Sequence, residues 1–220
     1  MRNPWENIEL SDYESHMALE SVMQLQAMNE IMGSQFYDYD VSTAMLLGVA
    51  GGNGLEHIQT DRFKKIYGVD INGRYLKECA ARFPQLRGLL VLIQADLQED
   101  ICVLPQSDLI IANLLLEYIG YESFVRAVRQ VNPRYISCVI QINGSGGFVS
   151  DSPFARALAC LEETHRQIEE RELGLAMADA GYADIRRQCF ELPNKKKLLR
   201  LDYEAGNQLN GHASEKVRFR

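Results

Sequence analysis

Short apolar runs alternate with amphipathic segments through the middle of the chain. The apolar runs occupy residues 44–49, 66–70, 88–94, 107–113 and 134–142. Between them, apolar residues recur at helical spacing at residues 54–64, 73–83 and 121–131, with a shorter connection at 97–104. Runs that are apolar on both faces and separated by helices predict parallel strands covered by helices. The pattern therefore predicts a doubly wound α/β fold with right-handed crossovers.

The C-terminal third departs from this alternation. Residues 153–180 have the spacing of a helical region. Two apolar runs follow, at residues 182–192 and 195–204, with only Pro193 and Asn194 as a break between them. Strands joined so closely must be antiparallel neighbours. We therefore expect a mostly parallel sheet that ends in an antiparallel C-terminal hairpin.

A helix is also expected before the alternation begins. Ser11 and Glu14 have the spacing of a capping box, in which the serine oxygen accepts a backbone N–H and the glutamate reaches back. Apolar residues then recur at helical spacing until Gly33, which is expected to end the helix. The aromatic residues 36–39 lead from this helix into the first strand.

The length of 220 residues fits one domain with a helical cover. We expect the cover at residues 1–40, the α/β domain at residues 41–204 and a polar tail at residues 205–220. A net charge of −7 argues against a general nucleic-acid binder, because such proteins are usually basic. The only lysine run, at residues 195–197, is interpreted as a solvated turn between the last two strands.

The five cysteines are widely spaced and contain no C-x-x-C pair. They lie in apolar segments, so we interpret them as reduced core thiols rather than disulfides or zinc ligands. No grouping of His, Asp or Glu has persuasive ligand spacing, and no metal site is expected. No run approaches 18 apolar residues, and the N-terminus lacks a cleavable leader pattern. The expected location is therefore the cytoplasm, with no membrane partner.

Glycines and polar residues gather where the predicted strands end. In a doubly wound sheet, ligands bind outside the carboxyl ends of the strands. The first strand runs into a glycine-rich loop at residues 48–54, and later strands end at Asp70, Asp96 and Asn113. The Asp70 carboxylate can accept hydrogen bonds from both hydroxyls of a ribose, and Asp96 can accept one from an adenine amino group. The alternative for both aspartates is a helix cap.

Four segments carry a family resemblance. The stretches "LLGVAGGNG", "IYGVDIN", "IQADL" and "DLIIANLLLEYIG" resemble, in this order, the successive motifs of class I S-adenosylmethionine-dependent methyltransferases. Each motif alone is weakly specific, but their order and the reversed hairpin agree with that family. The resemblance covers residues 41–204. It implies a seven-stranded sheet, S-adenosylmethionine as the cofactor, and methyl transfer by in-line displacement.

The resemblance also implies a role for each strand end. The glycine-rich loop would border the methionine and ribose of the cofactor, with amides at the start of the next helix facing its carboxylate. Asp96 and Leu97 would recognise adenine, and the Asn113 backbone would face the methyl-donor side. The residues expected to bind the cofactor are Gly48, Ala50, Gly51, Gly52, Asn53, Gly54, Asp70, Ile71, Asp96, Leu97, Asn113 and Leu114.

Two positions depart from the family's usual D-x-G-x-G-x-G pattern. Gly48 stands where an acid is usual, and Ala50 replaces the first glycine. The missing acid removes one partner for the cofactor's amino group, a loss on the order of 1–2 kcal/mol. Backbone carbonyls, Glu117 or a tyrosine at residues 36–39 are the alternative partners. Ala50 is expected to have a negative φ, because alanine tolerates a positive φ poorly.

The methyl acceptor is expected to be a small molecule, because the chain is acidic. A protein acceptor and some RNA acceptors are left open. DNA is disfavoured, because the residues after the fourth strand lack the Asn-Pro-Pro-aromatic pattern of adenine methylation and no cysteine ends a strand as a nucleophile. Substrate specificity is expected to reside in the first helix, the aromatic residues 37–39, and the loop at residues 144–147 with the helices that follow it. This loop has the flexibility of a hinge or lid, and an ordinary surface loop is the alternative. The candidate general bases are His16, His165 and Glu117.

Two other functions fit parts of the pattern. Asp70 would also suit the ribose of a nicotinamide cofactor, but His57 occupies the position of the last glycine in the required G-x-G-x-x-G. A methyltransferase-like domain that binds ligands without catalysis is the second alternative, and the altered positions Gly48 and Ala50 support it.

Overall fold

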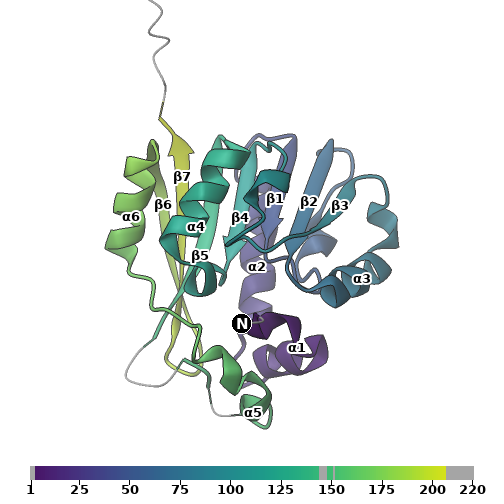
Figure 1. Cartoon of the computed structure of the whole chain (residues 1–220), viewed down its shortest axis with the longest axis vertical. Helices are drawn as coiled ribbons and strands as arrows, with labels where there is room; N and C mark the ends of the chain where they lie inside the picture. Colours follow the sequence, from purple (N-terminus) through teal and green to yellow (C-terminus); the bar gives the residue numbers. More distant parts are fainter. Residues whose placement is uncertain (1–2, 144–147, 151, 207–220) are drawn as a thin grey trace, which may run out of the picture.

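The structure, a computed structural model, describes residues 3–143, 148–150 and 152–206. Its strands are β1 Thr43–Leu47, β2 Lys65–Asp70, β3 Leu90–Gln94, β4 Leu109–Asn113, β5 Tyr135–Ile142, β6 Tyr182–Glu191 and β7 Lys197–Ala205. They form one sheet in the order β3-β2-β1-β4-β5-β7-β6 (Figure 1). β1 to β5 pair in parallel, and β7 is antiparallel to both β5 and β6. The predicted doubly wound sheet with its antiparallel C-terminal hairpin is confirmed.

Helices pack on both faces of this sheet. The α-helices are α1 Leu10–Ala18, α2 Gln24–Tyr37, α3 Gly73–Arg82, α4 Leu116–Val131, α5 Ala155–Leu158 and α6 Glu170–Asp179. Phe124 of α4 and Leu173 of α6 are buried in the core on one face, and Phe36 of α2 and Leu76 of α3 in the core on the other. In the described ranges, none of the helices has the length and apolar character needed to cross a membrane.

The strand order reverses between β1 and β4. The chain moves outward from β1 through β2 to β3, and then returns to place β4 on the other side of β1. Near the carboxyl ends, Leu47 of β1 lies between Val69 of β2 and Ala112 of β4. A crevice outside the strand ends at such a reversal is the usual ligand site of this fold class.

The N-terminal region forms two helices, so the prediction of one helix that ends at Gly33 is wrong. The chain turns between α1 and α2, where Met23 has a φ of 54°. Gly33 lies inside α2, which continues past it. The predicted capping box is also wrong, because Glu9 occupies the N-cap of α1 without a side-chain hydrogen bond. Glu14 instead forms an ion pair with Arg82 of α3.

The predicted helix at residues 54–64 is wrong as well. Only Leu55–His57 form a short 3-10 helix, η2, and the chain continues through turns. Ile58 and Phe63 are buried in the core between α2, α3 and the sheet. Their apolar side chains therefore anchor an irregular segment, and their spacing does not reflect a helical face.

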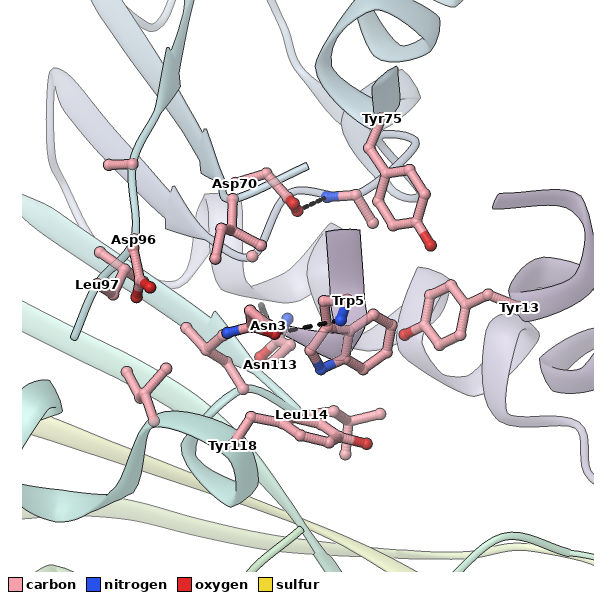
Figure 2. Close-up of a pocket in the computed structure, with 16 residues that line it drawn as sticks. Asn3, Trp5, Tyr13, Asp70, Tyr75, Asp96, Leu97, Asn113, Leu114 and Tyr118 are labelled. Carbon is pink, nitrogen blue, oxygen red and sulfur yellow. Dashed lines mark hydrogen bonds between the residues drawn. The ribbon is translucent and has the colours of Figure 1, made fainter. Parts of the chain in front are cut away.

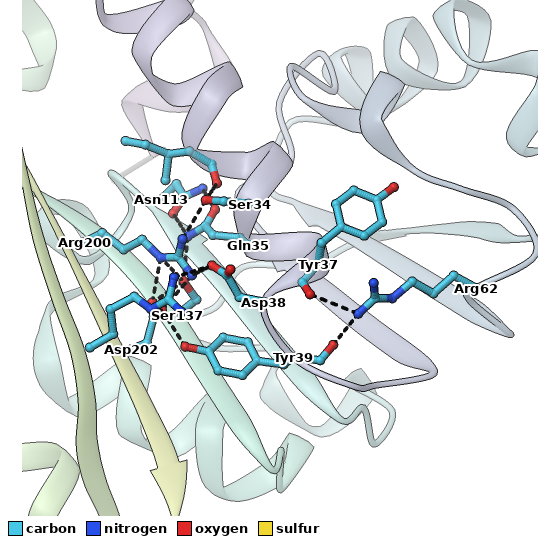
Figure 3. A network of polar contacts seen from close by, with 12 residues as sticks. Ser34, Gln35, Tyr37, Asp38, Tyr39, Arg62, Asn113, Ser137, Arg200 and Asp202 are labelled. Atoms are coloured by element: carbon cyan, nitrogen blue, oxygen red, sulfur yellow. Dashed lines mark hydrogen bonds and ion pairs between the residues drawn. The ribbon is translucent and has the colours of Figure 1, made fainter.

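A buried polar network joins the end of α2 to β5 and β7 (Figure 3). Arg200 of β7 is 0% exposed, and its guanidinium lies 2.6 Å from Asp202 Oδ2 and 2.8 Å from Asp38 Oδ2. The hydroxyls of Tyr39 and Ser137 donate hydrogen bonds to the Asp202 carboxylate. A buried charge is tolerated only when it is paired and hydrogen-bonded. The network therefore specifies where α2 meets the sheet.

The same turn of α2 also reaches the end of β4. Ser34 Oγ accepts a hydrogen bond from Arg200 at 2.7 Å. The next residue, Gln35, exchanges two side-chain hydrogen bonds with Asn113, at 2.8 and 3.0 Å (Figure 3). Gln35 also donates to Ser137 on β5. A strand-end residue of the crevice is thus held by the network.

Replacing Arg200 with methionine is expected to lower the free energy of unfolding by about 3–5 kcal/mol, because the buried Asp202 would lose its closest counter-charge and keep, among the described residues, only Arg186, at 3.5 Å. Urea denaturation of the wild type and the variant measures this loss. Arg129→Met on α4 is the matched control, because the Arg129 side chain is 61% exposed opposite Asp179. It should change stability far less, and equal losses in the two variants would contradict the expectation.

Candidate functional site

A cleft lies at the carboxyl ends of β1, β2 and β4, where the strand order reverses (Figure 2). Its floor is formed by strand-end residues, and its outer wall by aromatic side chains from the N-terminal region and α4. The lining residues are Asn3, Trp5, Tyr13, Gly48, Ala50, Asp70, Ile71, Tyr75, Ala95, Asp96, Leu97, Asn113, Leu114, Leu115, Tyr118 and Ile119. The cleft brings together most of the residues predicted to bind a cofactor. Gly51 and Asn53 line an adjoining hollow instead, and Gly52 and Gly54 line neither.

The glycine-rich loop turns sharply where β1 ends. Gly48 has a φ of 76°, and Ala50 has a φ of 47°, so the expectation of a negative φ at residue 50 is wrong. A left-handed conformation costs alanine about 1–2 kcal/mol. The Ala50 N–H donates to Asp70 Oδ2 at 2.9 Å (Figure 2), and this bond holds the unfavourable turn in place.

The later glycines of the loop pack against the protein itself. A Cβ on Gly54, which has a φ of 91°, would lie 2.7 Å from the Cβ of Met32 in α2. Asn53 ties the loop to the same helix, because its Nδ2 donates to the Leu25 carbonyl at 3.0 Å. The segment after Gly54 is only the short η2, so the expected helix N-terminus facing a cofactor carboxylate is not formed.

Asp70 is the most constrained acid of the cleft. It is 9% exposed, and burial raises the pKa of its carboxyl group. Oδ2 accepts the Ala50 N–H and Oδ1 accepts the Asn72 N–H, each at 2.9 Å. The side chain that caps α3 is that of Asn72, which accepts from Arg74 N. Each Asp70 oxygen keeps a further lone pair for a ligand hydroxyl.

The other strand-end residues approach the cleft in different ways. Asp96 accepts the Gln98 N–H at 2.8 Å, and Leu97 beside it is 5% exposed and packs in the core. The side-chain amide of Asn113 is occupied by Gln35, as described above. Leu114 has a φ of 53°, which turns the chain away from β4.

Four aromatic residues line the cleft but are not among the residues predicted to bind a cofactor: Trp5, Tyr13, Tyr75 and Tyr118. The Trp5 ring lies 4.9 Å from the Tyr118 ring and 5.2 Å from the Tyr13 ring, both edge to face (Figure 2). Trp5 belongs to a 3-10 helix, η1 Pro4–Glu6, whose N-cap Asn3 accepts the Trp5 N–H. An Asn before Pro is a recognisable helix start, but nothing in the sequence indicates that it folds back over distant strands.

A second cavity adjoins the cleft. Trp5, Tyr13, Leu114 and Tyr118 line both spaces and form their common wall. The remaining lining residues of the second cavity are His16, Gln24, Glu117, Gln141, Phe148, Val149, Ser150, Leu158, Leu161, Asn194 and Lys196. It therefore combines segments from both ends of the chain.

Two of the three predicted general bases line this cavity. Glu117 is 1% exposed, and burial raises its pKa to about 7. Its Oε1 accepts the Gln141 N–H at 2.7 Å, whereas Oε2 has no hydrogen-bond partner among the described residues. His16 bonds Ser152 Oγ through Nδ1, and burial lowers its pKa. His165 stacks on Phe148 and lines neither space.

The lysine run is not a fully solvated turn, which corrects the sequence-based interpretation. Lys196 is 7% exposed, and its Nζ donates to the Phe148 carbonyl. Burial lowers the pKa of its ammonium group to about 8. The tyrosines at 37 and 39 lie outside both spaces, bonded to the His57 carbonyl and to Asp202, so their expected place at the ligand is wrong. The predicted lid at residues 144–147 lies outside the described residues.

The cysteines contribute nothing to these spaces. Cys79 and Cys138 are buried, but Cys102, Cys160 and Cys189 are exposed, so the expectation of five core thiols is wrong for three of them. These three lie on short 3-10 segments and on the edge strand β6. Over residues 3–143, 148–150 and 152–206, no group of three His, Cys, Asp or Glu side chains could hold a metal ion.

Solved structures share the fold of this chain. N-methyltransferase NodS from Bradyrhizobium japonicum WM9, in complex with S-adenosyl-L-homocysteine, matches with a TM-score of 0.62 and 12% identity over 87% of this chain and 95% of that one. Magnesium protoporphyrin IX methyltransferase from Synechocystis PCC 6803, with S-adenosylhomocysteine bound, matches with a TM-score of 0.58 and 11% identity over 84% of this chain and 83% of that one.

The similarity lies in the fold rather than in the sequence. The cyclase SpnF matches with a TM-score of 0.62 at 9% identity, over 84% of this chain and 83% of that one. No protein-family model matches the chain, and no curated protein matches it in sequence. The expected seven-stranded α/β fold is confirmed by these structures, and the chemistry has to be argued from the site.

Glu117 is expected to make stability depend on pH. Its pKa is about 7 in the folded protein, above the ordinary 4.5, so the unfolded chain releases a proton that the folded chain keeps between these pH values. The Glu117 contribution therefore falls as pH rises through this window, by up to about 1.4 kcal/mol per pH unit. Glu117→Gln should remove this loss, as measured by urea unfolding across the window.

The control for this expectation is Glu122→Gln, an exposed position on the same helix. That variant should keep the slope of the wild type. A Glu117→Gln profile parallel to that of the wild type would contradict the expectation.

Proposed function

We propose that this protein is an S-adenosylmethionine-dependent methyltransferase that acts on a small molecule. The observation that supports this best is the placement of Asp70. Its buried carboxylate lies at the end of β2, bonded to the Ala50 amide of the loop that follows β1, at the strand reversal. A carboxylate at this place in an α/β sheet suits the two hydroxyls of a ribose.

The residues around Asp70 fit the rest of an adenosyl cofactor. We infer that Asp96 and Leu97 recognise the adenine, one by accepting its amino group and the other by packing on its ring. Ile71 would complete that side of the cleft. The backbone at Asn113 and Leu114 would face the methionine, because the Asn113 side chain is already bonded to Gln35. Gly48, Ala50, Gly51 and Asn53 would border the methionine, while Gly52 and Gly54 shape the loop.

The cofactor supplies an electrophilic methyl group on a sulfonium. The protein's tasks are to orient the acceptor and to exclude water. The cleft and the second cavity share a wall that includes Leu114, Trp5 and Tyr118. An acceptor in the second cavity would therefore approach the methyl group past these apolar side chains. Glu117 lies on the acceptor side of this wall, where it can receive a proton.

A different chemistry on the same scaffold is the second candidate. The cyclase SpnF shares the fold, and a fold alone does not determine a reaction. A ligand-binding protein without catalysis is the corresponding alternative. An assay with S-adenosylmethionine that carries a labelled methyl group distinguishes both alternatives from the proposal. Only a methyltransferase would transfer the label to an acceptor.

Calorimetric titration with S-adenosylmethionine tests the cofactor assignment. The wild type should bind, and Asp70→Asn should weaken binding by about tenfold or more, because an amide cannot replace a carboxylate that accepts two hydroxyls. Asp108→Asn is the matched control. Asp108 also accepts backbone N–H groups, from Ser42 and Thr43, but at the amino ends of the strands. It should bind the cofactor normally.

Fluorescence gives an independent reading of the same event. Trp5 is the only tryptophan of the chain and lines the cleft, so cofactor binding should change the emission of the wild type. A protein that shows neither heat nor an emission change with S-adenosylmethionine would refute the proposal.

A further inference from the structure

Two buried ionisable groups of opposite sign line the second cavity, and neither has an ion-pair partner among the described residues. Glu117 is 1% exposed and Lys196 is 7% exposed. Among the residues that the structure describes, no cation lies within ion-pair distance of Glu117, and no carboxylate lies within that distance of Lys196. Buried charges are normally paired, because desolvation is unfavourable. The described part of the cavity therefore supplies a counter-charge to neither group.

One carboxylate oxygen of Glu117 is available to accept a hydrogen bond from a ligand. Oε1 is occupied by the Gln141 N–H, but Oε2 has no partner. Aromatic rings of Trp5, Tyr13 and Tyr118 line the same cavity. Aromatic faces together with a carboxylate favour an ammonium group, through charge and cation–π attraction. A neutral hydroxyl could donate a hydrogen bond to Glu117 Oε2, but it would not compensate the charge of the carboxylate.

The ammonium group of Lys196 is available to bind an anion. Within the described ranges, its Nζ makes one hydrogen bond, to the Phe148 carbonyl, so two of its three N–H donors have no partner there. Ser150 and Asn194 line the cavity beside it, and Asn194 Nδ2 donates to Ser150 Oγ at 3.1 Å. The Lys196 ammonium matches a carboxylate, which would restore neutrality to a buried cation.

We infer, on the basis of the proposed methyl transfer, that the acceptor is an amino acid or a close zwitterionic relative. Its nitrogen binds at Glu117 and its carboxylate at Lys196. Both groups line only the second cavity, but Glu117 precedes Tyr118, which belongs to the common wall with the cofactor cleft. Lys196 comes from the β6–β7 turn, which contributes no residue to that wall. The nitrogen is thus the end that faces the methyl donor.

This placement gives Glu117 a defined part in the reaction. One ammonium proton of the acceptor passes to Glu117 Oε2, which leaves the nitrogen with a lone pair. A C–N bond forms with the methyl carbon as the S–C bond breaks, and the sulfur keeps the bonding electrons as a neutral thioether. The positive charge passes from sulfur to the methylated nitrogen, and Glu117 returns its proton to solvent.

The test uses the full-length protein and a defined panel. The panel comprises the twenty standard amino acids, the amines that lack their carboxylates, and the corresponding 2-hydroxy acids. Thermal unfolding with and without S-adenosylmethionine reads binding, and mass spectrometry locates the transferred methyl group. We expect at least one amino acid to raise the Tm and to be methylated on nitrogen, while its amine and its hydroxy acid fail.

Variants assign the two ends of the ligand. Lys196→Met should weaken amino acid binding by about tenfold or more, and Glu117→Gln should abolish transfer while S-adenosylmethionine still binds. Lys197→Met, an exposed neighbour that pairs with Glu191, should behave as the wild type.

The outcomes separate this inference from the proposed function. If S-adenosylmethionine binds but no amino acid stabilises the protein or is methylated, the zwitterion assignment fails and the cofactor assignment stands. Methylation of a hydroxy acid on oxygen, or of an amine as readily as its amino acid, also overturns it. An amino acid could instead raise the Tm of the wild type but not of Lys196→Met, while S-adenosylmethionine does not bind. This result would support the zwitterion site and refute the assignment as a methyltransferase.

Discussion

The buried ion pair between Arg200 and Asp202 is the interaction on which the site depends most. Both side chains are 0% exposed, and the desolvated guanidinium has to be matched by acceptors on every side. The acceptors come from β7 itself and from the end of α2, through Ser34 and Asp38. The pair thereby determines the position of α2 against the sheet. Helix α2 in turn holds the strand end at Asn113 and the loop after β1.

The glycine-rich loop takes its shape from these surroundings. Asp70 holds it from β2, while α2 holds it through Asn53 and through the close approach of Gly54 to Met32. Gly48 shows why no acid stands at the start of the loop. Its φ is 76°, and a Cβ there would lie 3.3 Å from Leu115. A larger residue would strain the backbone and displace this side chain.

The strands and the residues at their carboxyl ends could be predicted because both depend on local signals. Apolar runs bounded by glycine or aspartate predict buried strands, and the fold class then places Asp70, Asp96 and Asn113 at one edge. Trp5 and Lys196 could not be found in this way. Each lies in a segment of ordinary polar composition that meets the site only through tertiary contacts. The break at Met23 was missed for a related reason, since the helical spacing on its two sides is nearly continuous.

Trp5, Tyr13, Leu114 and Tyr118 have one face toward each of two neighbouring spaces. A wall of this kind would make the binding of a ligand in one space depend on a ligand in the other. Any rearrangement of Trp5 that one ligand induces changes the surface met by the other, and the free energy of that coupling is the same in both directions. The affinity of each space for a ligand would therefore depend, through four shared side chains, on whether the other space is filled.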